Sequence, residues 1–290
     1  MRIIFLIFLC ICYPRFVSGQ ENDTAIDTLA KEFISASALT VDHFGNIFVA
    51  DAGANEIIKF GSDGSTLNKF GGFGWSNTSL DRPHDIISPN SLDIYIADFG
   101  NHRILRLDRK LNFIASIPAE VSTDKQYRLF GYPLSVSLSS FGKLYILDGE
   151  NVQLLKVSSS GKVERSIGGN EAGLGKLKNP QKVRINGNNF IFVKDLNKII
   201  AFDVFGNYLR TFGKGVFIDL KTFSIYEEYL FVIDSTMLLK LDINGKRLIE
   251  VNLDKWIDKH SSIVDIFVTS KRIYLLTEHR LISFKRDDIL

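Results

Sequence analysis

Five short segments of one design recur along the chain, and this repeat constrains the fold more than any other feature. Each is a run of apolar residues that ends in an aspartate: Ile47–Asp51, Ile94–Asp98, Leu144–Asp148, Ile191–Asp195 and Leu230–Asp234. A sixth run, Tyr274–Thr277, has Thr277 where the others have aspartate. Their last residues lie 39 to 50 residues apart. Such spacing indicates a series of small equivalent units rather than one irregular core.

The residues around each run predict four short strands. In the first repeat these cover 38–41, 47–51, 56–60 and 66–70, with the polar turn Ser62-Asp63-Gly64 before the last. Glycine supplies the positive φ that tight hairpins need. Four antiparallel strands per ~45 residues are typical of a β-propeller blade. We therefore predict an all-β fold, a six-bladed β-propeller of four-stranded antiparallel blades.

The two ends of the chain predict how the ring closes. The last repeat begins near Ile263 and has only three strands before the chain ends. Residues 27–33 form a surplus strand before the first repeat. The sequence Thr28-Leu29 with Phe33 resembles Thr66-Leu67 with Phe70, the outermost strand of the first repeat. We expect residues 27–33 to complete the last blade and so remove two exposed sheet edges.

The first nineteen residues are typical of a secretory signal peptide. One positive charge precedes the apolar run 3–13, and small residues follow it up to Gly19, so cleavage before Gln20 is expected. The run is too short to span a bilayer, and no later run approaches that length. We predict a single domain over 20–290 in an exported protein that is periplasmic, cell-surface or extracellular, with no transmembrane segment in the mature chain.

Loss of this segment sets the charge and the redox chemistry of the mature chain. Both cysteines, Cys10 and Cys12, would be removed, so no disulfide or thiolate metal site is expected. The absence of cysteine fits a bacterial exported protein. The net charge falls from +2 to zero, which argues against nucleic-acid binding. Sequons at Asn22 and Asn77 matter only in a eukaryotic source.

The repeat resembles the NHL repeat over residues 27–290. The resemblance rests on Gly45-Asn46 before the first run, on 98–104 (Asp-Phe-Gly-Asn-His-Arg-Ile), and on the stretches from Gly71-Gly72 to Pro83 and from Gly168-Gly169 to Pro180. It implies a propeller of the exported bacterial type. We expect the aspartates that end the runs to bond backbone amides at the turns between the second and third strands.

The resemblance also implies two alternative functions. NHL-like propellers include non-catalytic binding scaffolds and peptidyl amidating lyases, which hold zinc with histidines near the central channel. Only His84 among the five histidines lies where such a ligand is expected; the equivalent positions are Leu134, Gln181 and Lys221. Calcium-dependent lactonases need several acidic or amide groups at the axis, where lysines oppose a cation. A metal-dependent lyase or hydrolase near His84 is therefore the alternative, and a purely structural surface protein a third.

The favoured interpretation is recognition of a protein, peptide or glycan through loops on one face of a monomer, without catalysis, metal or cofactor. Loops between blades supply most candidates, since aromatic and arginine side chains dominate interface energies. Packing of Trp75 and Tyr132 between blades is the alternative for those two. The candidate binding residues are Trp75, Asp81, Arg82, His84, Tyr127, Arg128, Tyr132 and Lys182.

Overall fold

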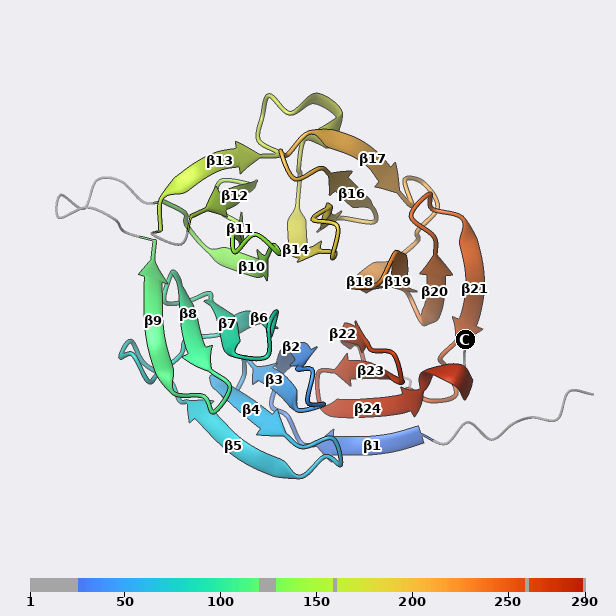
Figure 1. The fold of residues 1–290 in the computed structure, drawn as a ribbon. Coiled ribbons are helices and arrows are strands. Elements are labelled where there is room, and N and C mark those ends of the chain that lie inside the picture. The colour runs from blue at the N-terminus through green and yellow to red at the C-terminus, as the bar shows by residue number, and fades with distance from the viewer. Residues whose placement is uncertain (1–25, 120–128, 159–160, 259–260, 289–290) are drawn as a thin grey trace, which may run out of the picture.

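The strands form six separate sheets arranged around a central axis, as Figure 1 shows. The computed structural model describes residues 26–119, 129–158, 161–258 and 261–288. Each sheet has four antiparallel strands, and in five of them the strand order follows the chain order. The predicted six-bladed propeller is therefore confirmed.

Each blade runs from an innermost strand at the axis to an outermost strand at the rim. Blade 1 has β2 (Ala36–Val41), β3 (Ile47–Asp51), β4 (Glu56–Phe60) and β5 (Thr66–Gly71), and blade 2 has β6 (Pro83–Ile87), β7 (Asp93–Asp98), β8 (Arg103–Asp108) and β9 (Phe113–Pro118). Blade 3 has β10 (Pro133–Leu138), β11 (Leu144–Asp148), β12 (Gln153–Val157) and β13 (Val163–Ile167), and blade 4 has β14 (Pro180–Ile185), β15 (Ile191–Asp195), β16 (Ile199–Phe202) and β17 (Tyr208–Phe212). Blade 5 has β18 (Leu220–Tyr226), β19 (Tyr229–Asp234), β20 (Met237–Leu241) and β21 (Arg247–Asn252), and blade 6 has β22 (Ile263–Val268), β23 (Arg272–Thr277), β24 (Arg280–Lys285) and β1 (Ile26–Lys31).

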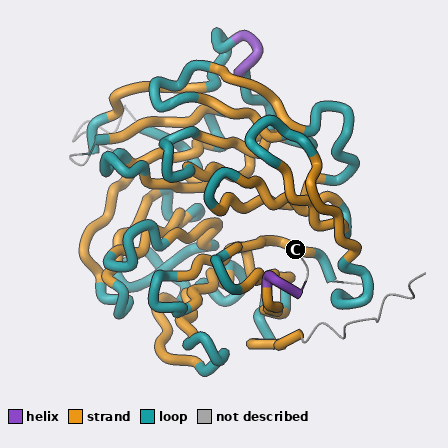
Figure 2. The backbone as a smooth tube through the Cα atoms, turned by 45° about the vertical axis from the view of Figure 1, so that its right-hand side comes forward, coloured by secondary structure: helices purple, strands orange, loops and turns teal. Residues whose placement is uncertain are grey.

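Apolar side chains hold neighbouring blades together. The second strand of a blade, such as β3 or β11, is buried along its whole length because another blade covers each face. The outermost strand, such as β5, is mostly exposed. Within the described residues the only helices are the short 3₁₀ turns η1 (Gly173–Gly175) and η2 (Arg286–Asp288), visible in Figure 2. None of the helices described has the length or apolar character needed to span a bilayer.

The N-terminal strand closes the ring. β1 pairs antiparallel with β24, so blade 6 contains residues from both ends of the chain. Arg272 of β23 forms an ion pair with Asp27 of β1. Past the strand, the amides of Glu32 and Phe33 donate to the carbonyl of His279. The predicted closure is therefore confirmed.

The residue alignment expected for this closing strand was wrong in detail. In blade 6 Ala30 lies opposite Leu281, and in blade 1 Phe70 lies opposite Ile57, which is the residue equivalent to Leu281. Ala30, and not Phe33, is therefore the counterpart of Phe70. Phe33 lies beyond the strand instead. It is buried between blades 6 and 1, with its ring 6.1 Å from that of Phe60 in an edge-on contact.

Each innermost strand carries one extra residue near its start. The register with the second strand shifts there, as a β-bulge does, and leaves that residue without a partner. The six bulged residues are Ser37, His84, Leu134, Gln181, Lys221 and Val264. These bulges place the next residue of each strand at the axis, where the candidate site lies.

We predict that removing residues 20–33 lowers the melting temperature by about 10 °C, since the loss exposes the edge of β24 and empties the Phe33 site. Differential scanning calorimetry on the chain that begins at Gln20 and on the chain that begins at Ile34 measures this. A chain that lacks only residues 20–25 is the control and should melt as the longer one does. Equal melting of all three chains would contradict the role of β1.

Candidate functional site

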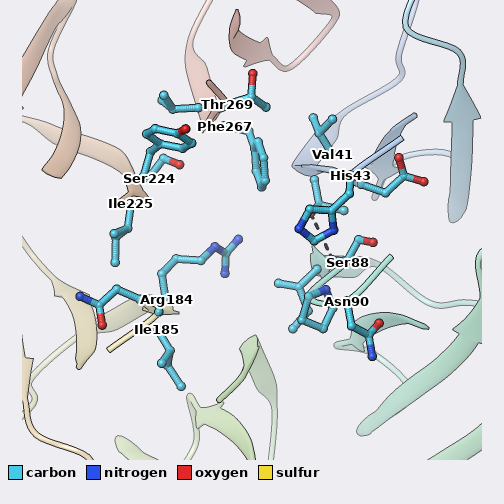
Figure 3. A pocket seen from close by; sticks show the side chains of 18 of the residues that line it. Val41, His43, Ser88, Asn90, Arg184, Ile185, Ser224, Ile225, Phe267 and Thr269 are labelled. Carbon is cyan, nitrogen blue, oxygen red and sulfur yellow. Dashed lines mark hydrogen bonds between the residues drawn. The ribbon is translucent and has the colours of Figure 1, made fainter. Parts of the chain in front are cut away.

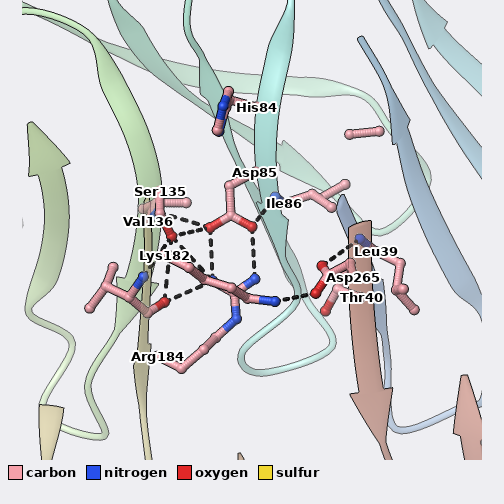
Figure 4. Close-up of polar contacts among 12 residues, drawn as sticks. Leu39, Thr40, His84, Asp85, Ile86, Ser135, Val136, Lys182, Arg184 and Asp265 are labelled. Carbon is pink, nitrogen blue, oxygen red and sulfur yellow. Dashed lines mark hydrogen bonds and ion pairs between the residues drawn. The ribbon is translucent and has the colours of Figure 1, made fainter. Parts of the chain in front are cut away.

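Charged side chains cross the central channel next to the six bulges (Figure 4). The residues that follow the bulges are Ala38, Asp85, Ser135, Lys182, Thr222 and Asp265, one from each blade. Arg184, two residues further along β14, lies beside them. We call Asp85, Ser135, Lys182, Arg184, Thr222 and Asp265 the axial network.

One half of the axial network is centred on Asp85. Arg184 binds its carboxylate through two nitrogens, with Nη1 to Oδ2 at 2.8 Å and Nη2 to Oδ1 at 2.7 Å. The Ser135 hydroxyl donates to Oδ2 at 2.5 Å, and the amide of Val136 in blade 3 donates to the same oxygen at 3.1 Å. This carboxylate therefore links blades 2, 3 and 4.

The other half is centred on Asp265. Lys182 forms an ion pair with Oδ1, and the Thr222 hydroxyl donates to the same oxygen at 3.0 Å. The amide of Leu39 in blade 1 donates to Oδ2 at 3.0 Å. This half links blades 4, 5, 6 and 1. Because Lys182 and Arg184 lie on one strand, the two halves together join all six innermost strands.

The buried charges of the axial network stabilise one another. Burial opposes ionisation of Asp85, but the charge and hydrogen bonds of Arg184, with Lys182 and Ser135, hold the pKa of that carboxyl below its usual value. Burial lowers the pKa of Lys182 against the opposing attraction of Asp265. Burial likewise opposes the charge of Arg184, yet Asp85 raises its pKa. The Asp85–Arg184 pair is thus fully charged at neutral pH.

A wide cavity of about 1140 Å³ opens at the carboxyl ends of the innermost strands (Figure 3). Its lining is rich in hydroxyl and amide groups, which include Ser88, Asn90, Ser224 and Thr269, and Arg184 borders it as well. The Ser88 hydroxyl is buried and has no hydrogen-bond partner among the described residues. The charged residues Asp42, Glu227, Lys271 and Arg272 also line it, so the cavity offers charged groups of both signs as well as neutral ones.

A narrower cavity of about 390 Å³ opens at the opposite ends of the same strands. We call it the narrow mouth. Asp85, Lys182 and Asp265 of the axial network border it, together with His84 and Lys194. Because Arg184 borders the wide cavity and its partner Asp85 borders the narrow mouth, the axial network separates the two cavities.

Three predicted binding residues come together beside the narrow mouth. The Arg82 guanidinium lies 5.2 Å from the centre of the Phe99 ring, the His84 ring lies 5.7 Å from it, and the Tyr132 ring stacks on it at 4.8 Å. His102 follows at 4.4 Å from Tyr132. We call these five side chains the aromatic row. It runs between blades 2 and 3, and His84 connects it to the narrow mouth.

The other predicted residues are more scattered. Trp75 is 75% exposed, and its ring meets the exposed Phe73 ring edge to face at 5.8 Å, so it does not pack between blades. Tyr132 is packed in the row yet 37% exposed. Asp81 donates its amide to Asp98 and binds Arg82 at 3.1 Å. Lys182 belongs to the axial network, and Tyr127 and Arg128 lie outside the described residues, as does the segment 1–19.

The aspartates that end the second strands have a wider structural role than predicted. Asp51 does accept from the amides of its turn, Gly53 and Ala54. It also accepts from Ile34 and Ser35, which lead into the innermost strand of the same blade. The same second contact recurs at Asp98, Asp148, Asp195 and Asp234. These carboxylates therefore fasten the start of each blade to its second strand.

Sequence reasoning missed four residues that matter for the site: Phe99, Asp85, Arg184 and Lys194. Phe99 stands out in the sequence only as part of a repeat motif, although an aromatic at a turn is a usable signal. Asp85 follows His84 directly, and the bulge decides which of the two faces the axis. Lys194 interrupts a buried apolar run, which is the clearest sequence signal of the four.

Metal ligation has little support among the described residues. No group of three or more His, Cys, Asp or Glu side chains gathers in residues 26–119, 129–158, 161–258 and 261–288 in a way that could hold an ion. The ring nitrogen Nδ1 of His84 is 2.8 Å from the carbonyl of Leu134, so a backbone contact occupies it.

Some solved structures with a similar fold are lyases by their descriptions. The sequence matches no protein-family model and no curated protein. It is similar to a streptogramin B lyase (TM-score 0.62, 13% identity, 88% of this chain and 80% of that one). Virginiamycin B lyase from Staphylococcus aureus has a TM-score of 0.62 and 13% identity, and the match covers 90% of this chain and 99% of that one. The catalytically inactive histidine-to-alanine variant of that lyase with quinupristin has a TM-score of 0.59 and 15% identity, and the match covers 86% of this chain and 80% of that one. At these identities the likeness shows the fold alone.

We predict that Asp85→Ala destabilises the protein by about 3 kcal/mol, because it leaves the largely buried Arg184 guanidinium without its carboxylate. Denaturant unfolding measures this. Asp85→Leu with Arg184→Met removes both charges and should recover much of the loss. A double variant that is no more stable than Asp85→Ala would contradict the pairing.

The lowered pKa of Asp85 also predicts a pH dependence. A carboxyl whose pKa is depressed in the folded state stabilises the fold fully when the pH is above its unfolded-state pKa of about 3.9. This contribution is lost as the pH falls from there through the folded-state pKa. Below about pH 4 the unfolding free energy of Asp85→Asn should therefore fall less steeply than that of the unsubstituted protein. Parallel slopes would show that Asp85 does not titrate in this way.

Proposed function

We propose that the mature chain is an exported, non-catalytic propeller that recognises a protein, peptide or glycan through the face carrying the aromatic row. One observation carries the proposal. Arg82, Phe99 and Tyr132, from loops of two blades, form a continuous stack that remains open to solvent at both ends of the run. The Arg82 side chain is 60% exposed and Tyr132 is 37% exposed.

The row has the chemistry of a recognition surface. Stacked rings and a guanidinium present large contact areas at small entropic cost, and such residues dominate interface energies. Phe73 and Trp75 extend the exposed aromatic surface over the neighbouring loop. Arg103 fastens that loop by donating to the carbonyls of Ser76 and Ser79 at 2.9 and 2.7 Å. The surface is therefore preorganised, which lowers the cost of binding.

The family, the address and the assembly state belong to the same proposal. The repeat supports membership of the NHL type, and the first nineteen residues support export with a mature chain that starts at Gln20. That the mature chain is a monomer is part of the same proposal. Amino-terminal sequencing of the protein recovered outside the cytoplasm tests the export step. A chain that still begins at Met1 would contradict it.

The alternative is a metal-dependent lyase or hydrolase near His84. The structural neighbours are described as lyases, which supports it, but the carboxylates beside His84 already bind Arg184 and Lys182. We therefore favour recognition over catalysis. Elemental analysis of the purified protein separates the two, since stoichiometric zinc or calcium that disappears in His84→Ala would favour the enzyme.

We predict that Phe99→Ala and Tyr132→Ala each weaken ligand binding about tenfold or more, because each removes a central ring of the stack. Arrays of defined glycans and peptides identify a ligand, and titration calorimetry then gives its affinity for each variant. Phe205→Ala removes an exposed ring on a distant loop and should leave binding unchanged. If the two row variants bind as tightly as the control, the chosen face is wrong.

A further inference from the structure

Lys194 occupies a position that the fold otherwise gives to hydrocarbon. It precedes the aspartate that ends the second strand of blade 4. The equivalent residues in the other blades are Ala50, Ala97, Leu147, Ile233 and Leu276, all fully buried. Lys194 is itself only 6% exposed. An ammonium group is thus enclosed at a place where nothing in the architecture requires a charge.

No carboxylate pairs with this ammonium among the described residues. Lys194 donates to the side-chain oxygen of Gln181, which is a neutral amide. The neighbouring lysines are different: Lys182 pairs with Asp265, and Lys221 pairs with Asp219 at 2.7 Å. A buried charge without an opposite charge is costly, so Lys194 is incompletely satisfied.

The narrow mouth gives Lys194 access to a ligand. Lys182, Lys194 and Lys221 all border this cavity of about 390 Å³. Its two carboxylates do not balance them, because Asp85 is bound by Arg184 and Asp265 by Lys182. The charge that remains is that of Lys194. The cavity is therefore a small, electropositive pocket with one uncompensated cation.

The titration of Lys194 is consistent with this surplus. Burial, together with the positive charges of Lys182 and Lys221, lowers its pKa to about 8 against the attraction of Asp219 and Asp195. An anion in the cavity would oppose each of these effects and raise the pKa again.

We propose that the narrow mouth binds an oxyanionic group, a carboxylate or a phosphate, with Lys194 as its principal partner and Lys221 at the rim. The amide of Gln181 holds the ammonium in the unliganded protein and is displaced by the stronger, charge-assisted bond. The volume admits a small group rather than a whole polymer. The site therefore takes the acidic end of a ligand.

The position of the site extends the proposed function. His84 belongs both to the aromatic row and to the lining of the narrow mouth. A ligand that lies along the row can thus place an acidic terminus or an acidic sugar in the cavity. This extension rests on the proposed function, whereas binding of a small anion by itself does not.

The test uses inorganic phosphate and acetate as separate probes. Lysines are labelled by reductive ¹³C-methylation, and the Lys194 resonance is assigned by its absence in Lys194→Met. A binding anion should move the titration midpoint of Lys194 upward from its unliganded value, and the arm with the larger shift identifies the preferred oxyanion. Affinity from calorimetry should fall about tenfold or more in Lys194→Met, because a charge-assisted bond is lost.

Two comparisons keep the result interpretable. Lys194→Met should fold at least as stably as the unsubstituted chain, since the equivalent positions hold Leu147 and Ile233. Lys214→Met removes the same charge from an exposed loop and should leave anion binding unchanged. An unmoved midpoint with both probes, or equal anion affinity in Lys194→Met and Lys214→Met, would overturn the proposal.

The outcome also separates this site from the proposed function. Anion binding that depends on Lys194, with no glycan or peptide ligand found for the aromatic row, would sustain the site and defeat the proposed function. A row-dependent ligand whose affinity is unchanged in Lys194→Met would sustain the proposed function and defeat its extension into the narrow mouth.

Discussion

The amide groups on the axis side of the innermost strands set the main constraint on this ring, because each of these strands has a neighbouring strand on one side alone. A buried amide needs an acceptor, and in a β-sheet the neighbouring strand normally provides it. In this ring, side chains from the adjacent blade provide it, as Asp85 does for Val136 and Asp265 for Leu39. Two carboxylates buried at the axis need positive charges beside them, because a buried charge without an opposite charge is costly. Lys182 and Arg184 follow from that need, and they bring all six blades into one polar network.

The same network gives the two ends of the channel different chemistry. Arg184 directs both of its terminal nitrogens to Asp85, and the wide cavity that it borders is lined by hydroxyl and amide groups, by apolar side chains and by charges of both signs, such as Glu227 and Lys271. At the other end the acids are satisfied and Lys194 is not. The two ends of the ring thus differ in their charge balance, with charges of both signs at the wide cavity and one surplus positive charge at the narrow mouth. The positive end is also the end where the aromatic row begins.

The sequence predicted the architecture because its signals are periodic. Six runs at similar spacing determine six blades, and the surplus strand before the first determines the closure. The site was harder to predict since it depends on single departures from the repeat. His84, Arg82 and Tyr132 were named as candidates from the sequence and do lie together in the structure, but Phe99 was hidden inside a repeat motif. Asp85 and Arg184 were missed because only the bulge register shows which residues face the axis, and contacts between blades leave no local pattern.

Pairing of β1 with β24 joins residues near 26 to residues near 284. The first strand to leave the ribosome therefore waits for its partner until almost the whole chain has been made. Contacts between such distant segments form late, because a very long loop must close first. Until then β1 has no partner strand and blade 6 is incomplete. A polypeptide with this arrangement stays unfinished throughout synthesis, which is the condition in which a chain can still be threaded through a narrow translocation pore.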